Sequence, residues 1–301
     1  RLSLLPGREL RRLLREANAD AIHIATEGPL GFAAWRHCKR NRIPFTTSYH
    51  TQFALYLNKY IGLPTSLGYR GLRWFHNRAE RTLVPTPSIN RELTSHGFTN
   101  IITWTRGVDT KLFRPYGKEL FSRLPRPVFV YCGRVAIEKN IEAFLGCDMP
   151  GSKVVIGDGP AMASMKSRFP SAHYVGFRKG EDLARHVAAG DVFVFTSRTD
   201  TFGVVMLEAM ACGLPVAAYP VTGPVDVVRP GVTGVLHDDL RTACLEALKM
   251  NPEDCRAQAI EFSWKRCAMM FLDNLATSHN HDGAESRLES VPQSQPANVG
   301  V

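Results

Sequence analysis

The sequence lacks several features that would assign it quickly to a class of protein. Its 301 residues contain no apolar run near the roughly 18 residues that a membrane-spanning helix needs. No Cys-x-x-Cys pair suggests a zinc or redox site. With 44% hydrophobic and 22% charged residues, the composition also excludes collagen, a coiled coil and a wholly disordered chain. The expectation that remains is a globular protein large enough for two domains.

The cysteines indicate the compartment in which the protein resides, and the first residue indicates that the sequence is a fragment. Seven cysteines are widely spaced, at positions 38, 132, 147, 212, 244, 255 and 267. An odd number without a pairing pattern is typical of buried thiols in a reducing compartment, so we expect a cytoplasmic protein. The chain begins at Arg1 without an initiator methionine or a signal segment, and we expect a fragment of a longer protein.

The net charge of +9 is distributed unevenly along the chain. Residues 1–117 hold 18 Lys/Arg and 7 Asp/Glu, a balance of +11, whereas residues 118–301 hold 19 and 21, a balance of −2. Such an asymmetry indicates an anionic partner for the first half: a nucleic acid, an anionic membrane surface or an acidic acceptor. Nucleic acid is disfavoured because no recognition motif accompanies the charge.

Short β-rich runs alternate with segments of helical period, a pattern typical of parallel sheets covered by helices. Strands are predicted at residues 128–132, 154–156, 173–175, 192–195, 216–218 and 234–236, with helices at 138–145, 161–168, 181–189, 204–211 and 240–250. The first half shows strands at 21–24, 45–48, 83–85 and 101–104, with helices at 30–40 and 89–96. We therefore predict two domains, residues 1–117 and 118–261. A final helix lies within 262–278, and the tail 279–301 is polar and expected to be disordered.

Two predicted strand ends in the second domain carry groups suited to a pyrophosphate. Gly133 and Arg134 follow the strand at 128–132, and Lys139 lies on the next helix, so two cations meet backbone N–H groups. Gly157 and Gly159 form a glycine turn after the next strand, where the backbone can approach a ligand closely. A nicotinamide dinucleotide is disfavoured because the third glycine of that fingerprint is absent.

A third strand end is the most informative. Asp200 lies in the loop after the strand at 192–195, Gly203 opens the next helix, and Glu208 lies about a turn and a half inside it. A carboxylate can accept two hydroxyl hydrogen bonds, as the diol of a ribose or sugar would offer. The helix N-terminal amides near Gly203 and Val204 would face phosphates. Glu208 is flanked by apolar residues, which disfavours a merely solvated surface carboxylate.

The order and spacing of these motifs resemble glycosyltransferase family 4: Gly-Arg-x4-Lys-Asn, Gly-Asp-Gly-Pro, Asp-x7-Glu and Gly-x-Pro-Val. Within that family the chain is most similar to the GDP-mannose-dependent α-mannosyltransferases and the sulfoquinovosyl or glucuronosyl lipid transferases. The resemblance implies the GT-B fold, an α/β architecture of two Rossmann-like doubly wound parallel-sheet domains facing a cleft. It also implies transfer of a hexose with retention, from GDP-mannose or a UDP-sugar to a lipid or glycan acceptor.

By the same resemblance, each motif residue has an expected role. Arg134 and Lys139 bind the donor diphosphate, Glu208 binds the ribose, and Asp200 with the backbone of Phe202, Gly203 and Val204 binds the transferred sugar. His50, at another strand end, matches a histidine near the donor sugar. No metal or other cofactor is expected, because the protein's cations stand at the leaving group. The glycines Gly133, Gly157 and Gly159 complete the donor site.

Three departures from the family pattern are visible in the sequence. Asp200 stands where the family usually has Glu, and Arg106 stands where it has Asn. The opening strand and glycine-rich loop of the family are absent, so the first domain is expected to be incomplete. Two alternatives therefore stay open: a degenerate protein that binds a sugar nucleotide without turnover, and a nucleotide-sugar epimerase of the same fold.

Basic and apolar side chains alternate in two segments of the first half, which suits an interfacial surface on anionic lipid. One segment carries Arg8, Arg11, Arg12 and Arg15; the other carries Tyr60, Tyr69, Arg70, Arg73, Trp74 and Phe75. A solvated basic face is the alternative. We expect a cytoplasmic protein that can be peripheral on the inner face of the membrane.

Overall fold

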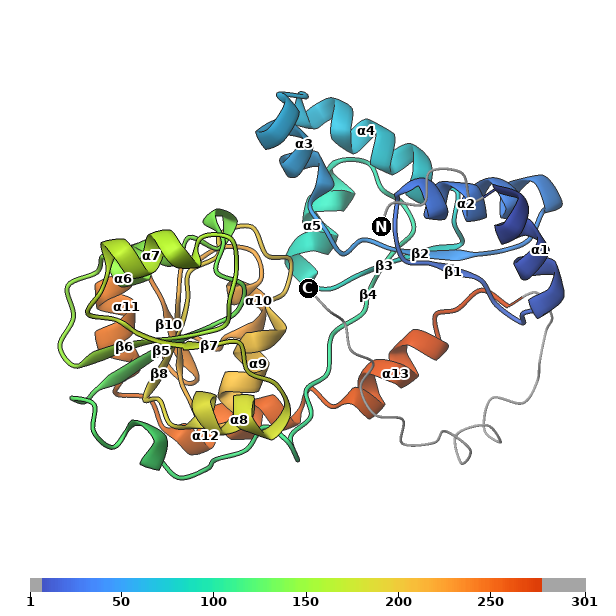
Figure 1. Cartoon of the computed structure of the whole chain (residues 1–301). Coiled ribbons are helices and arrows are strands. Elements are labelled where there is room, and N and C mark those ends of the chain that lie inside the picture. Colours follow the sequence, from blue (N-terminus) through green and yellow to red (C-terminus); the bar gives the residue numbers. More distant parts are fainter. Residues whose placement is uncertain (1–6, 278–301) are drawn as a thin grey trace.

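The computed structural model describes residues 7–277, which form two parallel-sheet α/β domains (Figure 1). The chain crosses between the domains twice, and the two crossing segments lie against each other. Val108 N–H donates to the carbonyl of Phe262 at 2.8 Å, and Gly107 approaches so closely that a Cβ there would lie 2.7 Å from the backbone of Trp264. Glycine at 107 is therefore required by the close approach.

The first domain contains a four-stranded parallel sheet in the order β1-β2-β3-β4. The strands are β1 (His23–Ile24), β2 (Thr46–Ser48), β3 (Arg81–Val84) and β4 (Ile101–Thr103). Its helices are α1 (Gly7–Ala17), α2 (Pro29–Asn41), α3 (Phe53–Ile61), α4 (Thr65–His76) and α5 (Pro87–Ser95). Two clusters of buried apolar residues form its core, one around Tyr49, Leu72 and Leu93 and one around Trp35, Phe45 and Phe75.

The second domain contains a six-stranded parallel sheet in the order β10-β9-β8-β5-β6-β7. The strands are β5 (Val128–Cys132), β6 (Ser152–Ile156), β7 (His173–Gly176), β8 (Val192–Phe195), β9 (Val216–Ala218) and β10 (Gly234–Leu236). The helices are α6 (Ile141–Leu145), α7 (Met162–Arg168), α8 (Gly180–Ala188), α9 (Val204–Ala211), α10 (Pro224–Val227), α11 (Leu240–Ala247) and α12 (Pro252–Ile260), with short 3-10 turns at Glu119–Phe121 and Ile137–Lys139.

The core of the second domain explains why its strands read as continuous apolar runs. Alternate residues of β5 enter different clusters: Val128 and Val130 pack with α8, α9 and α12, whereas Phe129 and Tyr131 pack with α6, α7 and α11. Both faces of the sheet are thus covered by helices, as expected for a parallel sheet. The predicted strands at 128–132, 192–195, 216–218 and 234–236 have these same bounds in the structure.

The last helix, α13 (Trp264–Leu272), follows the second domain in sequence but contacts the first (Figure 1). The indole of Trp104 donates to the carbonyl of Cys267 at 2.9 Å, and the ring of Phe271 packs edge-on against His23 with centroids 4.8 Å apart. The predicted tail, residues 279–301, lies outside the described residues.

Several expectations about helices are wrong. The helix predicted at 138–145 begins only at Ile141, because Asn140 adopts a left-handed conformation (φ 53°) between a 3-10 turn and α6. Helices α1, α3, α4, α10 and α12 were not predicted. Of the aromatic residues expected on an interfacial surface, Tyr69 and Phe75 are each only 5% exposed and belong to the core, whereas Trp74 is 44% exposed.

The basic helix near the start also differs from the expectation. Arg12 lies between two acidic side chains of its own helix, pairing with Glu9 at 2.5 Å and Glu16 at 2.9 Å. Its charge is therefore largely balanced locally, which weakens its attraction for an anionic surface. The side chain of Arg8 is not among those that the structure describes.

Candidate active site

The two loops that carry most of the predicted site residues meet at one point of the second sheet. The strand order reverses between β5 and β8, which lie side by side. From β5 the sheet continues through β6 and β7 to one edge, and from β8 it continues through β9 and β10 to the other. Loops after such neighbouring strands form a crevice at the carboxyl edge, where parallel α/β sheets bind ligands. The segments 133–139 and 196–203 leave β5 and β8 at this edge.

Two glycines let two backbone loops of the site lie in contact. A Cβ at Gly157 would stand 2.0 Å from the carbonyl oxygen of Gly133, and one at Gly159 would stand 2.4 Å from that of Val135. Gly133 N–H donates to Ile156 O, and Val135 N–H donates to Asp158 O. Any side chain at position 157 or 159 would force these loops apart, so the glycines define the shape of the crevice.

Lys139 and Asp200, 61 residues apart in sequence, form a two-pronged ion pair. The ammonium Nζ lies 2.6 Å from Asp200 Oδ1 and 2.9 Å from Oδ2, and both side chains keep some exposure, 29% and 21%. The backbone beneath is fixed by Thr196, whose hydroxyl donates to the carbonyl of Lys139 at 2.5 Å. A fixed cation and a fixed carboxylate thus stand together at the crevice.

Arg134, in the loop that follows β5, has a freer side chain than Lys139. Its guanidinium is half exposed, and its ion pair with Glu138 is long, at 3.9 Å. The backbone is held instead, because the Tyr131 hydroxyl donates to the carbonyl of Arg134 at 2.8 Å. A guanidinium held so loosely is available to an incoming anion.

Helix α9 begins at the crevice with the predicted Phe202-Gly203-Val204 segment. Gly203 precedes the helix with φ of 82°, and a Cβ there would lie 2.8 Å from both Met206 Cε and Phe195 Cζ. Phe202 is 5% exposed and packs edge-on against the ring of Phe262. The first turn of α9, which begins at Val204, therefore follows directly on the loop that carries Asp200, and a helix N-terminus favours an anion.

Glu208 is a carboxyl group without a partner. It makes no hydrogen bond or ion pair with any side chain that the structure describes, and burial raises its pKa to about 7. Burial, followed by the nearby Glu208, also raises the pKa of the Cys132 thiol, which ends β5. A desolvated carboxyl close to the end of β5 is poised for a ligand's hydroxyl groups, since these would restore its lost hydrogen bonds.

His50 reaches the same loop from the first domain. The backbone carbonyl of His50 accepts from the hydroxyl of Thr201, next to Asp200, at 3.0 Å. Its ring nitrogen Nδ1 lies 2.8 Å from Nη2 of Arg106. Since a guanidinium only donates, Nδ1 accepts and the proton of the neutral ring is on Nε2. Burial, with the Arg106 charge second, lowers the pKa of His50 to about 4.

The structure thus brings Lys139 against Asp200 and His50 against Thr201, whereas Gly157 and Gly159 pack on the loop that begins at Gly133. Sequence reasoning had noted Arg106 only as a departure from a pattern. Its role as the partner of His50 was missed, because the two residues lie 56 positions apart and share no motif. Within residues 7–277, no group of three or more His, Cys, Asp or Glu side chains is arranged to hold a metal ion.

Two family models match the chain, one for each domain. Residues 1–112 match the model described as Glycosyltransferase Family 4, and residues 126–250 match the model described as Glycosyl transferases group 1. The chain therefore belongs to the family 4, group 1 glycosyltransferases, and its two domains have the GT-B fold.

Three transferases are among the curated relatives. The GDP-mannose-dependent alpha-mannosyltransferases of Corynebacterium glutamicum and Mycobacterium tuberculosis are each 32% identical, over 78% and 77% of this chain and 59% and 64% of their own. The sulfoquinovosyl transferase of Arabidopsis thaliana is 32% identical over 73% of this chain and 47% of its own. The chain thus spans about half to two thirds of the length of these relatives.

Solved structures share the fold at low sequence identity. HepE of Anabaena, in complex with UDP, superposes with a TM-score of 0.71 at 18% identity, covering 88% of this chain and 80% of that one. Sucrose-phosphate synthase from Thermosynechococcus elongatus superposes with a TM-score of 0.76 at 20% identity, covering 87% and 74%. In the part of this chain that the structure describes, no helix is long and apolar enough to cross a bilayer.

Proposed function

We propose that the protein is a retaining hexosyltransferase that uses a nucleotide diphosphate sugar, GDP-mannose or a UDP-sugar, and a lipid or glycan acceptor. The observation that carries the proposal is the ion pair of Lys139 and Asp200 at the switch point of the second sheet, with His50 reaching it from the first domain. The names of the relatives support a nucleotide-sugar donor, since they include GDP-mannose-dependent transferases.

The proposed chemistry breaks the bond between the anomeric carbon and the donor's pyrophosphate. The bonding electron pair leaves with the phosphate oxygen, and Arg134 and Lys139 stabilise the negative charge that develops there. The acceptor hydroxyl oxygen forms the new bond on the same face of the sugar and releases its proton to the leaving phosphate. A diphosphate carries more charge than one carboxylate, so it can compete with Asp200 for Lys139.

Three other groups orient the donor in this proposal. The unpartnered carboxyl of Glu208 accepts hydrogen bonds from the ribose hydroxyls, and Asp200, freed from Lys139, accepts from hydroxyls of the sugar. His50, neutral at physiological pH, offers its Nε2–H to the sugar. None of these roles requires a metal ion, because cations of the protein face the leaving group.

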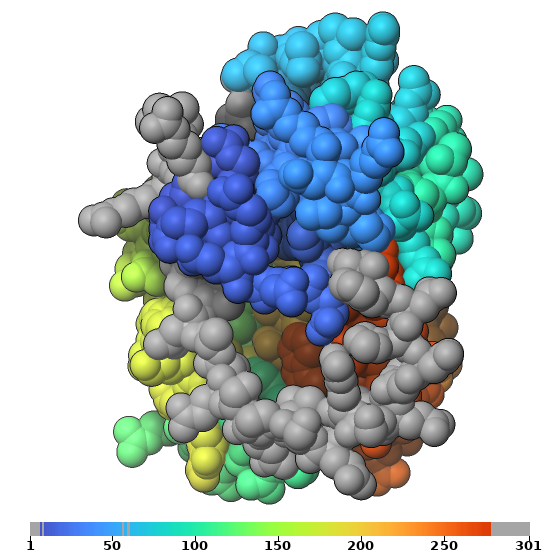
Figure 2. Space-filling model, turned by 90° about the vertical axis from the view of Figure 1, so that its right-hand side faces the viewer, coloured from blue at the N-terminus to red at the C-terminus, as the bar shows by residue number. Residues whose placement is uncertain are grey.

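The acceptor side is assigned to the first domain, whose surface combines exposed apolar groups with cations. Figure 2 shows the blue and cyan residues of this domain forming the upper half of one face. On α3 and α4, Ile61 and Leu67 are 69% and 51% exposed, and Arg70 and Arg73 of α4 are exposed as well. Apolar groups flanked by cations favour adsorption to an anionic lipid surface, on the cytoplasmic face of a membrane.

A donor panel followed by a transfer assay tests the proposal. UDP-, GDP- and ADP-sugars are first compared by the rise in melting temperature that each causes, since a ligand that binds only the folded state stabilises it. The best donor is then incubated with an acceptor and the anomeric configuration of the product determined by NMR. A retained configuration is expected. Sugar interconversion without acceptor would indicate an epimerase, and binding without turnover would indicate a non-catalytic binder.

A further inference from the structure

A carboxylate that the motifs did not identify stands at the edge of the first sheet, next to His50. In the register of β1 and β2, Ile24 pairs with Thr47. Glu27 follows Ile24 by three residues, and His50 follows Thr47 by three, so the two leave neighbouring strands at the same carboxyl edge. This is the edge through which the first domain contacts the loop of Asp200.

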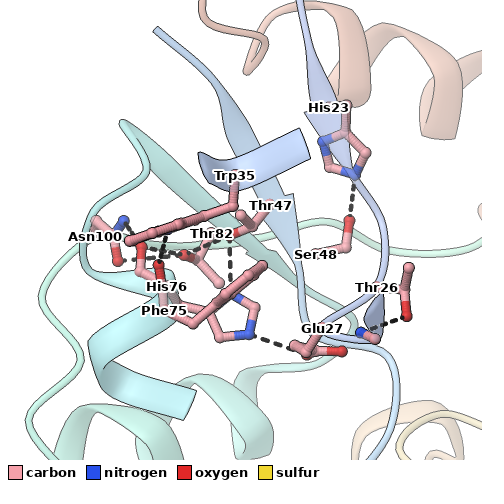
Figure 3. A network of polar contacts seen from close by, with 11 residues as sticks. His23, Thr26, Glu27, Trp35, Thr47, Ser48, Phe75, His76, Thr82 and Asn100 are labelled. Atoms are coloured by element: carbon pink, nitrogen blue, oxygen red, sulfur yellow. Dashed lines mark hydrogen bonds and ion pairs between the residues drawn. The ribbon is translucent and has the colours of Figure 1, made fainter. Parts of the chain in front are cut away.

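Glu27 is held by a chain of buried polar groups that runs across the sheet (Figure 3). Its Oε1 lies 3.0 Å from Nε2 of His76, a fully buried ring, and Nδ1 of that ring lies 2.9 Å from the Thr47 hydroxyl. The carboxylate only accepts, so Nε2 carries a proton. With a neutral ring, Thr47 donates to Nδ1 and accepts in turn from the hydroxyl of Thr82 at 3.0 Å.

The backbone around this chain is fixed as well. The amide of Asn100 donates to the carbonyls of His76 and Ala79, which anchors the end of α4. On the other side, α2 packs directly on the residue before Glu27: a Cβ at Gly31 would lie 1.7 Å from the carbonyl oxygen of Thr26. Glu27 thus has little freedom to turn away from the edge, which is the property expected of a binding group.

One oxygen of the carboxylate is not used by the protein. Oε2 makes no hydrogen bond with any described residue. Among residues 7–277, the fully buried side-chain oxygens that lack a partner are Tyr49 Oη and Asp226 Oδ2, so Oε2 of Glu27 is reached by solvent. The side chain as a whole is only 11% exposed. A preorganised acceptor atom with a narrow opening suits one hydroxyl group.

We infer that Glu27 binds the acceptor substrate, with its free oxygen accepting a hydrogen bond from an acceptor hydroxyl group, and that His76 positions Glu27. The inference rests on the proposed function and extends it to the acceptor side. Glu27 belongs to the first domain, whereas the groups assigned to the donor diphosphate and ribose belong to the second. Removing the carboxylate should therefore weaken acceptor binding and spare donor binding.

Steady-state kinetics on the full chain separate the two substrates, with octyl α-mannopyranoside as the acceptor probe. Glu27→Gln keeps the shape and removes the charge. It should raise the acceptor KM roughly 10- to 100-fold, the loss expected for one hydrogen bond to a charged group. The donor KM and the rate of donor hydrolysis by water should stay within about twofold. His76→Gln should raise the acceptor KM in the same direction by a smaller factor.

Glu92→Gln is the matched control, because Glu92 is also a first-domain carboxylate held by one neighbour, the Tyr69 hydroxyl, but lies on α5. An acceptor KM unchanged in Glu27→Gln, or raised equally in Glu92→Gln, would overturn the inference. Absence of transfer by the wild-type protein would instead contradict the proposed function itself. If Glu27→Gln does not fold, Glu27→Asp, which keeps the charge but shortens the reach, should show the same selective rise in acceptor KM.

Discussion

At the scale of single residues, the site is a set of charges that are only partly neutralised. Lys139 is balanced by Asp200, Arg134 has one distant partner, and Glu208 has none among the described residues. Each of these groups loses hydration without full compensation from the protein, and a ligand can supply what is missing. Their contributions to binding and to turnover can therefore be measured separately.

Replacing either cation should act mainly on turnover. Lys139→Ala and Arg134→Ala should each lower kcat roughly 10²- to 10³-fold, the usual loss for one group that stabilises transition-state charge. The measurement is the initial rate of sugar transfer at saturating donor. Lys166→Ala is the control. Lys166 belongs to α7 and lies over the ring of Tyr174, outside the crevice, so its replacement should change the rate little. A Lys139→Ala protein with nearly full rate would contradict the diphosphate assignment.

Glu208 allows a prediction in which stability and binding change in opposite directions. Its pKa is raised to about 7 in the folded protein, from 4.5, so the folded state holds the proton more tightly than the unfolded state. The free energy of unfolding should therefore fall as pH rises through this range, and Glu208→Gln should be more stable than the wild type above pH 7. Below pH 4.5 the two should be similar.

Nucleotide binding gives the second half of this test. If the ionised carboxylate accepts hydrogen bonds from the ribose, GDP or UDP should bind more tightly as pH crosses about 7 in the wild type. Glu208→Gln should bind the nucleotide more weakly and lose that pH step. Calorimetric titrations at pH 6 and pH 8 would measure it. A variant that gains stability and also retains full affinity would exclude Glu208 from the donor site.

At the scale of elements, the sequence predicted the second sheet well because its strands are buried on both faces and bounded by glycine turns. The helices of the first domain were harder to predict. Gly62 ends α3 in a left-handed conformation and Pro64 precedes α4. These strong breakers interrupt the helical pattern, and the sequence indicated only an interfacial surface there, without a helix. Asn140, a left-handed residue inside a predicted helix, left no signal at all.

In the site, too, some features were predictable from local sequence and others were not. Motif spacing identified residues on single loops, such as Asp200 and Glu208. The contact of His50 with Arg106, and that of Glu27 with His76, join residues about 50 positions apart, and no local pattern predicts such a pair. These contacts depend on which strands are neighbours and in what register, which only the folded sheet shows.

The start of α9 supplies a prediction for one element. Gly203→Ala places a methyl group at a φ of 82° and 2.8 Å from Met206 and Phe195, so it should destabilise the protein by about 1–3 kcal/mol and weaken nucleotide binding. Gly71→Ala is the matched control: Gly71 lies inside α4 with nothing within 4 Å of the added Cβ. It should raise stability by up to about 1 kcal/mol. Urea unfolding measures both, and equal effects would contradict the argument.

At the scale of the whole molecule, the two domains meet through a few polar contacts as well as the crossing segments. Asp226 of the second domain accepts from the backbone N–H and hydroxyl of Ser88 at the start of α5, at 3.0 and 2.9 Å. The proposed site draws on both domains, with His50 and Glu27 from the first and the remaining groups from the second, so it depends on these contacts. The cations of the second domain and the positive surface of the first lead to two further predictions.

The first concerns metal ions. Activity should survive an excess of EDTA, because in the proposed mechanism Arg134 and Lys139 supply the positive charge at the leaving group that a divalent ion supplies elsewhere. The measurement is the transfer rate before and after chelation, followed by addition of magnesium. Loss of activity on chelation with recovery on adding magnesium would contradict this expectation.

The second concerns the surface of the first domain, which should bind anionic vesicles. Residues 1–117 carry the whole excess of positive charge, and Ile61 and Leu67 are exposed on the same pair of helices as Arg70 and Arg73. Binding to phosphatidylserine vesicles, measured by sedimentation, should weaken as salt rises, because screening shortens the range of the attraction. Replacing Arg70 and Arg73 by alanine should cost about 2 kcal/mol if each contributes about 1.

The response to salt distinguishes the apolar contribution to vesicle binding from the contribution of the charges. Ile61→Ser should weaken binding by a factor that stays the same at low and high salt, since burial of apolar area does not depend on screening. Phe177→Ser is the matched control, because Phe177 is 68% exposed but belongs to the second domain, which has no positive excess. Equal losses from Ile61→Ser and Phe177→Ser, or binding insensitive to salt, would contradict a membrane-facing first domain and would leave a soluble glycan as the acceptor.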